Sequence, residues 1–347
     1  MKRVSWNEID EVCQSLKDGK LVCFPTETVY GIACIADNEA AFQRLVEAKR
    51  RSPDKPFTLM CSSIGEAIRY AEIDAHTISA MKDFMPGPIT MLLKVRKDVP
   101  SWVTLGFPTI GVRVPSSPEV LALIDKVGMP LLVPSANLSG DEAPASSKDL
   151  NEDLMNACEY VIEGECEGKN ASTVALLSDS SNPSIIREGP ISLEQIKASL
   201  KKEPLSVFIG SDHGGFRYKE EIKKHLAVRG FQVIDCGTGG TASCDYPVFA
   251  RKVAKSVALD EKSLGIVVCT SGQGVMMTAN HVPGVRCAMG YDDRATYKSR
   301  EHNNANVISF GQSYMSLEDV LRRADEFLGE KFSTSPRHAR RVEMIEN

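Results

Sequence analysis

The sequence predicts an α/β protein of two domains, in which a twisted mixed sheet is followed by a doubly wound parallel sheet. Two observations lead to this fold class. The chain has 347 residues, more than a single hydrophobic core usually serves. Short apolar segments of strand length alternate with amphipathic helical segments, and the alternation is most regular in the second half.

A charged stretch near residue 200 marks the predicted boundary between the two domains. Residues 193–200 have apolar side chains at helical spacing, Lys201-Lys202-Glu203-Pro204 follows, and a new apolar strand begins at residue 205. Charge and a proline between a helix and a strand are typical of a short linker. We therefore expect domains at 1–200 and 205–347, joined by 201–204.

The second half repeats a strand followed by a helix. Strands are predicted at 205–210, 231–235, 264–269, 285–289 and 306–310, and helices at 214–229, 247–259, 292–302 and 317–328. Strands this apolar indicate a parallel sheet with helices on both faces. Because ligands bind beyond the carboxyl ends of such strands, we expect the chemistry near Asp212 and Cys269.

The first half is also α/β, with less regular spacing. Strands are predicted near 20–24, 57–61, 89–95, 110–114, 131–134, 173–177 and 184–187. Helices are predicted near 6–18, 39–49, 77–84, 116–127 and 192–200. This irregular order favours a mixed, twisted sheet.

Composition and charge exclude several classes of protein. With 42% hydrophobic and 25% charged residues the chain matches a soluble globular protein, and no apolar run approaches the roughly 20 residues of a membrane span. A net charge of −5 lacks the basic excess of a general nucleic-acid binder. Ten cysteines without a C-x-x-C pair, and a start without the apolar stretch of a signal peptide, indicate free thiols in a cytoplasmic protein without structural zinc.

A cysteine at a strand end has a chemical use in the second half. Cys269 precedes the loop Thr270–Gly274, whose backbone N–H groups can stabilise both a thiolate and an oxyanion. A thiolate can remove a proton from a carbon beside a carbonyl, and a nearby histidine can open a sugar ring. The residues alone leave another interpretation open, in which the thiol is buried for packing and the histidines are structural.

Residues from about 205 to 345 resemble ribose-5-phosphate isomerase B along their whole length. The motifs that carry this resemblance are GSDHGG (210–215), DYP (245–247), VVCTSGQG (267–274), TANHVPGVR (278–286), REHNNANV (300–307) and PRHARRV (336–342). The resemblance implies a Rossmann-like α/β/α sandwich that interconverts ribose 5-phosphate and ribulose 5-phosphate without a cofactor or metal. It also implies a site shared across a homodimer or a higher homo-oligomer.

The same resemblance assigns roles by position. It implies that Cys269 moves a proton between C2 and C1, that Ser271 helps to hold the enediolate, and that His302 opens the ring with help from Asp212. The residues implied to bind the sugar phosphate are His213, Tyr246, Gly272, Gly274, Asn280, Asn303, Arg337 and Arg341. Ser313 stands where many family members have an arginine, so a different aldose phosphate is an alternative substrate.

The first half carries a second set of motifs. They are FPTETVYG (24–31), KRR (49–51), KPF (55–57), MPGPIT (85–90), GVRVP (111–115), PSANLSG (134–140), STV (172–174) and IREG (186–189). Small hydroxyl residues at strand ends, with lysine and arginine nearby, suit an anion such as a triphosphate. The open alternative is that these loops only turn the chain and that the basic residues cap a helix.

Together these motifs resemble the YrdC/YciO family over residues 5–200. Its threonylcarbamoyl-AMP synthases join L-threonine, bicarbonate and ATP, and the expected nucleotide substrate is ATP with Mg²⁺. The residues implied to line the ATP and threonine site are Thr26, Thr28, Tyr30, Lys49, Arg51, Arg113, Ser135, Asn137, Ser172 and Arg187. The resemblance extends to tRNA modification, with tRNA or tRNA-modification proteins as partners and with double-stranded RNA binding.

The subgroup within this family is left open by the sequence. Lys49, Arg51 and the Ser-Ala-Asn motif match the synthases, whereas residues 57–61 and 109–118 are closer to the YciO branch. The alternative to a synthase is a nucleotide- or RNA-binding module without catalytic activity, which accompanies the isomerase.

Overall fold

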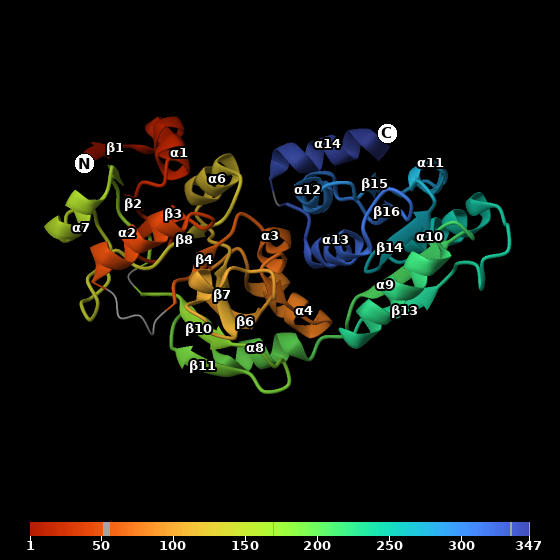
Figure 1. Cartoon of the computed structure of the whole chain (residues 1–347), viewed down its shortest axis with the longest axis horizontal. Helices are drawn as coiled ribbons and strands as arrows, with labels where there is room; N and C mark the ends of the chain where they lie inside the picture. The colour runs from red at the N-terminus through yellow and green to blue at the C-terminus, as the bar shows by residue number, and fades with distance from the viewer. Residues whose placement is uncertain (51–55, 169, 334, 347) are drawn as a thin grey trace. The chain divides into compact units, whose positions relative to one another are not determined.

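The computed structural model describes residues 1–50, 56–168, 170–333 and 335–346. The chain divides into two compact units, one made of Met1–Ile73 with Asp83–Leu200 and the other of Asp74–Lys82 with Lys201–Asn347 (Figure 1). Most of helix α4 (Ala75–Phe84) is thus grouped with the C-terminal part of the chain.

The first unit is built on a mixed sheet. Its strands are β1 (Lys2–Val4), β2 (Val22–Phe24), β3 (Gly31–Ile35), β4 (Leu59–Met60), β5 (Ala71–Glu72), β6 (Ile89–Val95), β7 (Thr109–Arg113), β8 (Leu131–Leu132), β9 (Tyr160–Ile162), β10 (Thr173–Leu176) and β11 (Ser184–Arg187). They follow the order β1-β9-β2-β3-β8-β4-β7-β6-β10-β11, with β5 paired to β6. Strand β2 pairs parallel to β9 and antiparallel to β3, so both directions occur within one sheet.

Helices cover this sheet, and their ends follow from local sequence. They are the 3₁₀ turn η1 (Trp6–Glu8), α1 (Ile9–Lys17), α2 (Glu39–Lys49), α3 (Ile64–Ile68), α5 (Ser101–Thr104), α6 (Pro118–Val127), α7 (Glu152–Ala157) and α8 (Leu193–Leu200). Helix α6 begins where the Ser117 hydroxyl accepts the Val120 N–H at 3.3 Å, and Pro118 occupies its first turn. It ends at Gly128, whose φ of 87° is left-handed.

The second unit is a parallel sheet with helices. Its strands are β12 (Ser206–Ser211), β13 (Gln232–Asp235), β14 (Leu264–Cys269), β15 (Cys287–Met289) and β16 (Val307–Gly311), in the order β13-β12-β14-β16-β15. Its other helices are α9 (Phe216–Val228), α10 (Tyr246–Leu259), α11 (Gln273–Ala279), α12 (Asp293–Asn303), α13 (Leu317–Gly329) and α14 (Pro336–Glu346). All four strand pairs are parallel. A core of valine and alanine side chains from α10, α11 and the strands holds the helices on the sheet.

The register of this sheet defines two edges. At the carboxyl edge Cys269 pairs with Gly311, and at the amino edge Gly265 pairs with Val307. Strand β14 has six residues, so at about 3.3 Å per residue the two edges are about 17 Å apart. This separation determines which residues can meet within one chain.

The predicted fold class is confirmed in both halves, with a mixed sheet first and a parallel α/β arrangement second. The structure adds helices α3, α5, α7, α11 and α14 and strands β1, β3, β5 and β9, which the sequence did not predict. Among the described residues, no helix is both long and apolar enough to cross a membrane.

Candidate active sites

The loop after β12 crosses the carboxyl edge of the parallel sheet. It contains Asp212, which is 6% exposed and accepts the Gly215 N–H through Oδ1 at 3.1 Å. A Cβ atom on Gly215 would lie 2.4 Å from the Val268 carbonyl oxygen. Only glycine therefore lets this loop run across the end of β14, which places Asp212 beside the next loop of the sheet.

Cys269 is the last residue of β14 and is 5% exposed. Its Sγ accepts the backbone N–H of Gly272 at 3.1 Å. Gly272 has a φ of 79°, a left-handed conformation that turns this N–H toward the sulfur. The loop therefore holds a backbone donor beside the Cys269 sulfur.

Three further predicted residues lie at the same edge. The Nδ1 atom of His213 is 3.2 Å from the backbone N of Cys244, which donates its proton to the ring. Tyr246 begins α10, and its ring lies so close to Gly274 that a Cβ atom there would be 2.6 Å from Cζ. Ser271 accepts the Gln273 N–H at 3.3 Å. The carboxyl edge thus gathers one predicted group, namely Asp212, His213, Tyr246, Cys269, Ser271, Gly272 and Gly274.

The other predicted residues lie toward the amino edge. Helix α12 leads into β16, so His302 and Asn303 lie just before the strand residue Val307 that pairs with Gly265. The Asn280 amide bonds both backbone groups of Cys287 at the start of β15, at 2.9 and 2.7 Å. A cavity of about 520 Å³ is lined by Asn280, Asn303, Cys287, Ser299 and Ile345, among others.

Helix α14 packs on α12 and adds a residue that the sequence analysis did not assign. The ring of His338 lies 4.1 Å from the ring of His302, between centroids, with a 44° tilt. Its Nε2 accepts from Arg337 at 3.1 Å, a bond that requires the neutral ring. Burial lowers the pKa of His338, and the positive charges of Arg337 and Arg341 lower it further. The sequence could have identified His338, because this residue lies inside the PRHARRV motif.

The first unit brings Lys49 to the loop after β8. Lys49 ends α2 and is only 2% exposed. Its ammonium group donates to the backbone carbonyls of Ser135 and Asn137, the second at 2.6 Å. The same loop donates the Ala136 N–H to the Tyr30 carbonyl at 2.7 Å, so the Ser-Ala-Asn motif and the loop after β2 are neighbours.

Arg113, at the end of β7, reaches the loop after β2. Its Nη2 donates to the Thr28 hydroxyl at 2.9 Å and to the Glu27 carboxylate at 2.6 Å. Thr26 and Thr28 share a hydroxyl hydrogen bond of 3.0 Å. The Nε atom of Arg113 is buried and has no hydrogen-bond partner within the described part of the chain. Glu27 was not assigned from the sequence, although it lies within the FPTETVYG motif.

Arg187 and Ser172 form the remaining side of this site. Arg187 donates to the Ser172 carbonyl at 2.8 Å and to its hydroxyl at 3.1 Å. Burial lowers the pKa of Arg187, and the charge of Arg113 adds to this effect. A guanidinium group beside a hydroxyl suits an anion such as phosphate.

Tyr30 and Arg51 are the remaining predicted residues of this site. Tyr30 is fully buried and donates its hydroxyl to the Ile162 carbonyl at 2.9 Å, so it holds the loop through its hydroxyl. Burial raises the pKa of Tyr30. Arg51 lies outside the described residues.

The side chains around Lys49 and Arg113 fit a triphosphate. Lysine, arginine and hydroxyl donors match phosphate oxygens. Within residues 1–50, 56–168, 170–333 and 335–346, no three histidine, cysteine or acidic side chains are grouped as metal ligands.

Comparisons with known proteins match each half of the chain separately. The Sua5/YciO/YrdC family model, described as telomere recombination, matches residues 14–189. The LacAB/RpiB family model, described as ribose/galactose isomerase, matches residues 207–345. The ribose-5-phosphate isomerase B of Mycolicibacterium paratuberculosis is 40% identical over 142 residues, which cover 41% of this chain and 89% of that protein.

The first half has relatives of two kinds. The threonylcarbamoyl-AMP synthase of Bacillus subtilis is 34% identical over 195 residues, which cover 55% of this chain. The match spans only 56% of that synthase's own length. The crystal structure of Escherichia coli YciO matches with 28% identity and a TM-score of 0.51, covering 56% of this chain and 96% of that one.

Proposed function

The chain belongs to the Sua5/YciO/YrdC family through its first half and to the LacAB/RpiB isomerase family through its second, and we propose that it is a bifunctional enzyme. The proposed domains are 1–200 for the synthase and 205–347 for the isomerase. All ten cysteines are free thiols, which supports a reducing, cytoplasmic location for both reactions.

For the second half we propose interconversion of ribose 5-phosphate and ribulose 5-phosphate. The Cys269 thiolate removes the C2 proton from the open-chain aldose, which leaves an enediolate, and the same proton is returned to C1. The Gly272 N–H and the Ser271 hydroxyl hold the enediolate oxygens, while His302 opens the furanose ring. His213, Arg337 and Arg341 bind the phosphate.

One observation carries the proposal of a site shared between two copies, namely that the residues proposed for the reaction lie at opposite edges of one sheet. Cys269 ends β14 at the carboxyl edge, whereas His302 precedes β16 at the amino edge, about 17 Å away by strand length. Ring opening and proton transfer must act on one substrate. We therefore propose that the carboxyl edge of one copy meets the amino edge of a second copy, and that two-fold symmetry gives two equal sites.

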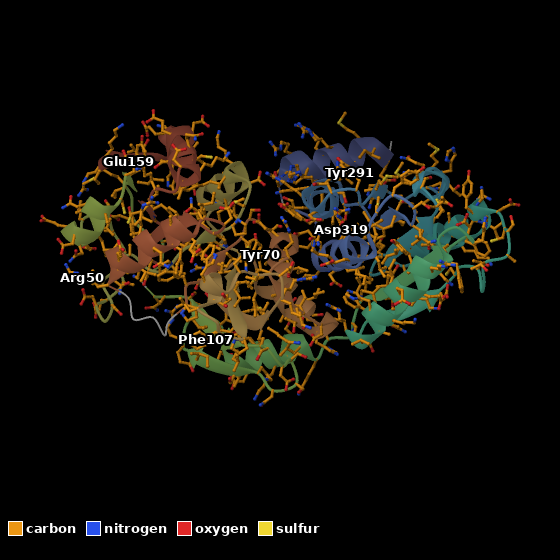
Figure 2. The ribbon with its side chains drawn as sticks, viewed as in Figure 1. Arg50, Tyr70, Phe107, Glu159, Tyr291 and Asp319 are labelled. Carbon is orange, nitrogen blue, oxygen red and sulfur yellow. The ribbon has the colours of Figure 1, made fainter. Side chains whose placement is uncertain are left out.

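Exposed apolar side chains support this pairing. Tyr291, labelled in Figure 2, is 67% exposed just after β15. Other large apolar side chains of this unit exposed by 39–77% are Tyr246, Val248, Met277, Tyr314, Met344 and Ile345. Exposed apolar side chains near both predicted residue groups are suited to burial against a second copy of the chain.

Complementation between two inactive variants tests the shared site. Cys269→Ala and His302→Ala are each expected to be inactive, and mixing them under subunit exchange should restore about a quarter of wild-type activity, because half of the dimers are mixed and each has one intact site of two. As a control, Cys269→Ala mixed with the Cys269→Ala/His302→Ala double variant should stay inactive. A mixture of the single variants that stays inactive while forming mixed dimers would contradict a shared site.

For the first half we propose the synthesis of threonylcarbamoyl-AMP from L-threonine, bicarbonate and ATP, for tRNA modification. Lys49 and Arg113 would neutralise phosphate oxygens, while Thr26 and Thr28 would contact threonine. Within the described part of the chain the Nε atom of Arg113 is buried and has no hydrogen-bond partner, which supports a ligand at this position. The test is release of pyrophosphate from ATP that requires both threonine and bicarbonate.

A second candidate for this half is nucleotide or RNA binding without synthesis. The match to almost the whole of YciO favours it, since the synthase match covers little more than half of that enzyme. ATP binding by calorimetry without threonine-dependent release of pyrophosphate would favour this second candidate.

A further inference from the structure

A buried lysine lies below the loop that follows β13. Lys219, in the first turns of α9, is 1% exposed, and its ammonium group donates to Asp235 Oδ2 at 2.7 Å and to the Thr238 carbonyl at 2.8 Å. It also lies 3.0 Å from Glu220 Oε1. A buried charge is costly unless all its donors are bonded, so these contacts hold their partners firmly.

The lysine fixes the first turn of the loop, residues 236–238. Asp235 uses its second oxygen to accept the Gly237 N–H at 2.8 Å. The Thr238 N–H is bonded to the Ser211 carbonyl at 2.9 Å, and the Cys236 N–H to the Ile209 carbonyl at 2.7 Å. This turn is therefore held against the end of β12, directly before Asp212 and His213.

The far end of the same loop contacts the sugar-phosphate site. Cys244 donates its N–H to His213 Nδ1 at 3.2 Å, and Tyr246 follows at the start of α10. Between the two ends, residues 241–243 are exposed, and a side chain on Gly239 or Gly240 would meet nothing within 4 Å. The middle of the loop thus has little packing of its own, and Tyr246 is held by α10, which packs on β12 and α11.

We propose that Lys219 is a positioning residue for the isomerase site, which holds the 236–238 turn against Ser211 and through it positions Asp212 and His213. This inference rests on the proposed isomerase function. His213 binds the substrate before and during the reaction, whereas the Cys269 loop is held by β14 and α11. Loss of the lysine should therefore weaken substrate binding and leave proton transfer largely unchanged.

A neighbouring lysine provides a matched control. Lys223 lies one turn later on α9 and donates to the same Asp235 oxygen at 2.6 Å, but it also donates to Glu220 and not to the loop carbonyl. Lys219→Met should raise KM for ribose 5-phosphate about tenfold, with kcat changed less than about threefold, as for loss of a charged hydrogen bond. Lys223→Met should leave both constants near wild type. Equal effects of the two variants, or a fall in kcat alone, would overturn the proposal.

A second variant disturbs the loop without removing a charge. A Cβ atom on Gly237 would lie 2.7 Å from the Ser211 nitrogen and 2.8 Å from Lys219 Cδ. Gly237→Ala should therefore displace the turn and also raise KM about tenfold with kcat largely retained. A normal KM in a variant that melts like wild type would contradict the proposal.

A readout independent of activity separates this inference from the proposed function. Iodoacetamide alkylation of Cys244, followed by peptide mass spectrometry, should be faster in Lys219→Met than in Lys223→Met or in the wild-type chain. Faster alkylation would support the loop-fixing role even if the wild-type chain did not isomerise ribose 5-phosphate. Identical alkylation rates in all three proteins would overturn it.

Discussion

Lys49 and Cys269 are both buried residues at the end of a regular element, yet their surroundings differ. Lys49 donates hydrogen bonds to the backbone carbonyls of Ser135 and Asn137 within its own unit. Arg113 donates one to the Thr28 hydroxyl in the same unit. Cys269 is bonded by its own loop, while the residues expected to complete its site lie at the other edge of the sheet. The residues of the first site meet within one copy, whereas the shared site proposed above would divide those of the second between two copies.

This difference has a physical origin in the two sheets. A mixed sheet connects neighbouring strands in both directions, so loops from distant parts of the chain converge on one region. In the parallel sheet every helix returns the chain to the amino edge, so α12 and Cys269 necessarily end at opposite edges. If the proposed shared site is correct, only the second arrangement makes catalysis depend on association.

The largest expected effect separates the two activities. Cys269→Ala removes the proposed base and should lower isomerase kcat about 10³-fold, while threonine-dependent pyrophosphate release stays at the wild-type rate. Cys287→Ala is the matched control, because it removes another buried strand thiol that lies at the amino edge. Coupled assays on the same preparations measure both rates. Equal losses in both cysteine variants would indicate a packing effect.

A substitution in the first unit should lower the synthase activity alone. Lys49→Ala removes a buried ammonium group proposed to meet phosphate oxygens, so the synthase kcat/KM should fall about 10²-fold or more. Isomerase activity should not change. Lys17→Ala, at the exposed end of α1, is the control and should leave both rates intact. Isomerase loss in Lys49→Ala would show that the two sites are not independent.

A smaller effect is expected on dilution. The isomerase activity per chain should follow the fraction of dimers, which decreases as the concentration falls below the dissociation constant. Pyrophosphate release per chain should stay constant over the same series. Mass photometry gives the dimer fraction at each concentration. An isomerase activity that persists in samples shown to be monomeric would exclude the shared site.

Much of the parallel unit could be predicted from sequence, because each apolar strand is followed by a helix of ordinary length. Helix α11 was missed because its seven residues, QGVMMTA, are too short to show helical periodicity. Helix α14 was missed because its exposed basic face leaves only His338 and Val342 buried. In the first unit, β1, β5 and β9 have two or three residues each, too few for a recognisable pattern.

The sites were predicted as sets of residues but not as geometries. Motifs placed Cys269 and His302 in one reaction, and the parallel pairing of β14 with β16 puts them at opposite edges. Lys219 was not found because a lysine in an amphipathic helix normally faces solvent, and its burial depends on the loop that folds over it.

The smallest expected effect concerns His338, which stacks on His302 and accepts from Arg337. Burial and the charges of Arg337 and Arg341 lower its pKa in the folded chain, partly opposed by Glu301. As the pH falls below about 6.5, the unfolded chain takes up this proton before the folded chain does, so folding stability decreases until the folded ring is protonated too. His338→Gln cannot titrate, and its melting temperature should fall less than that of the wild-type chain between about pH 7 and pH 5. Parallel melting curves for the two proteins across this range would mean that His338 is protonated as readily in the folded chain as in the unfolded one.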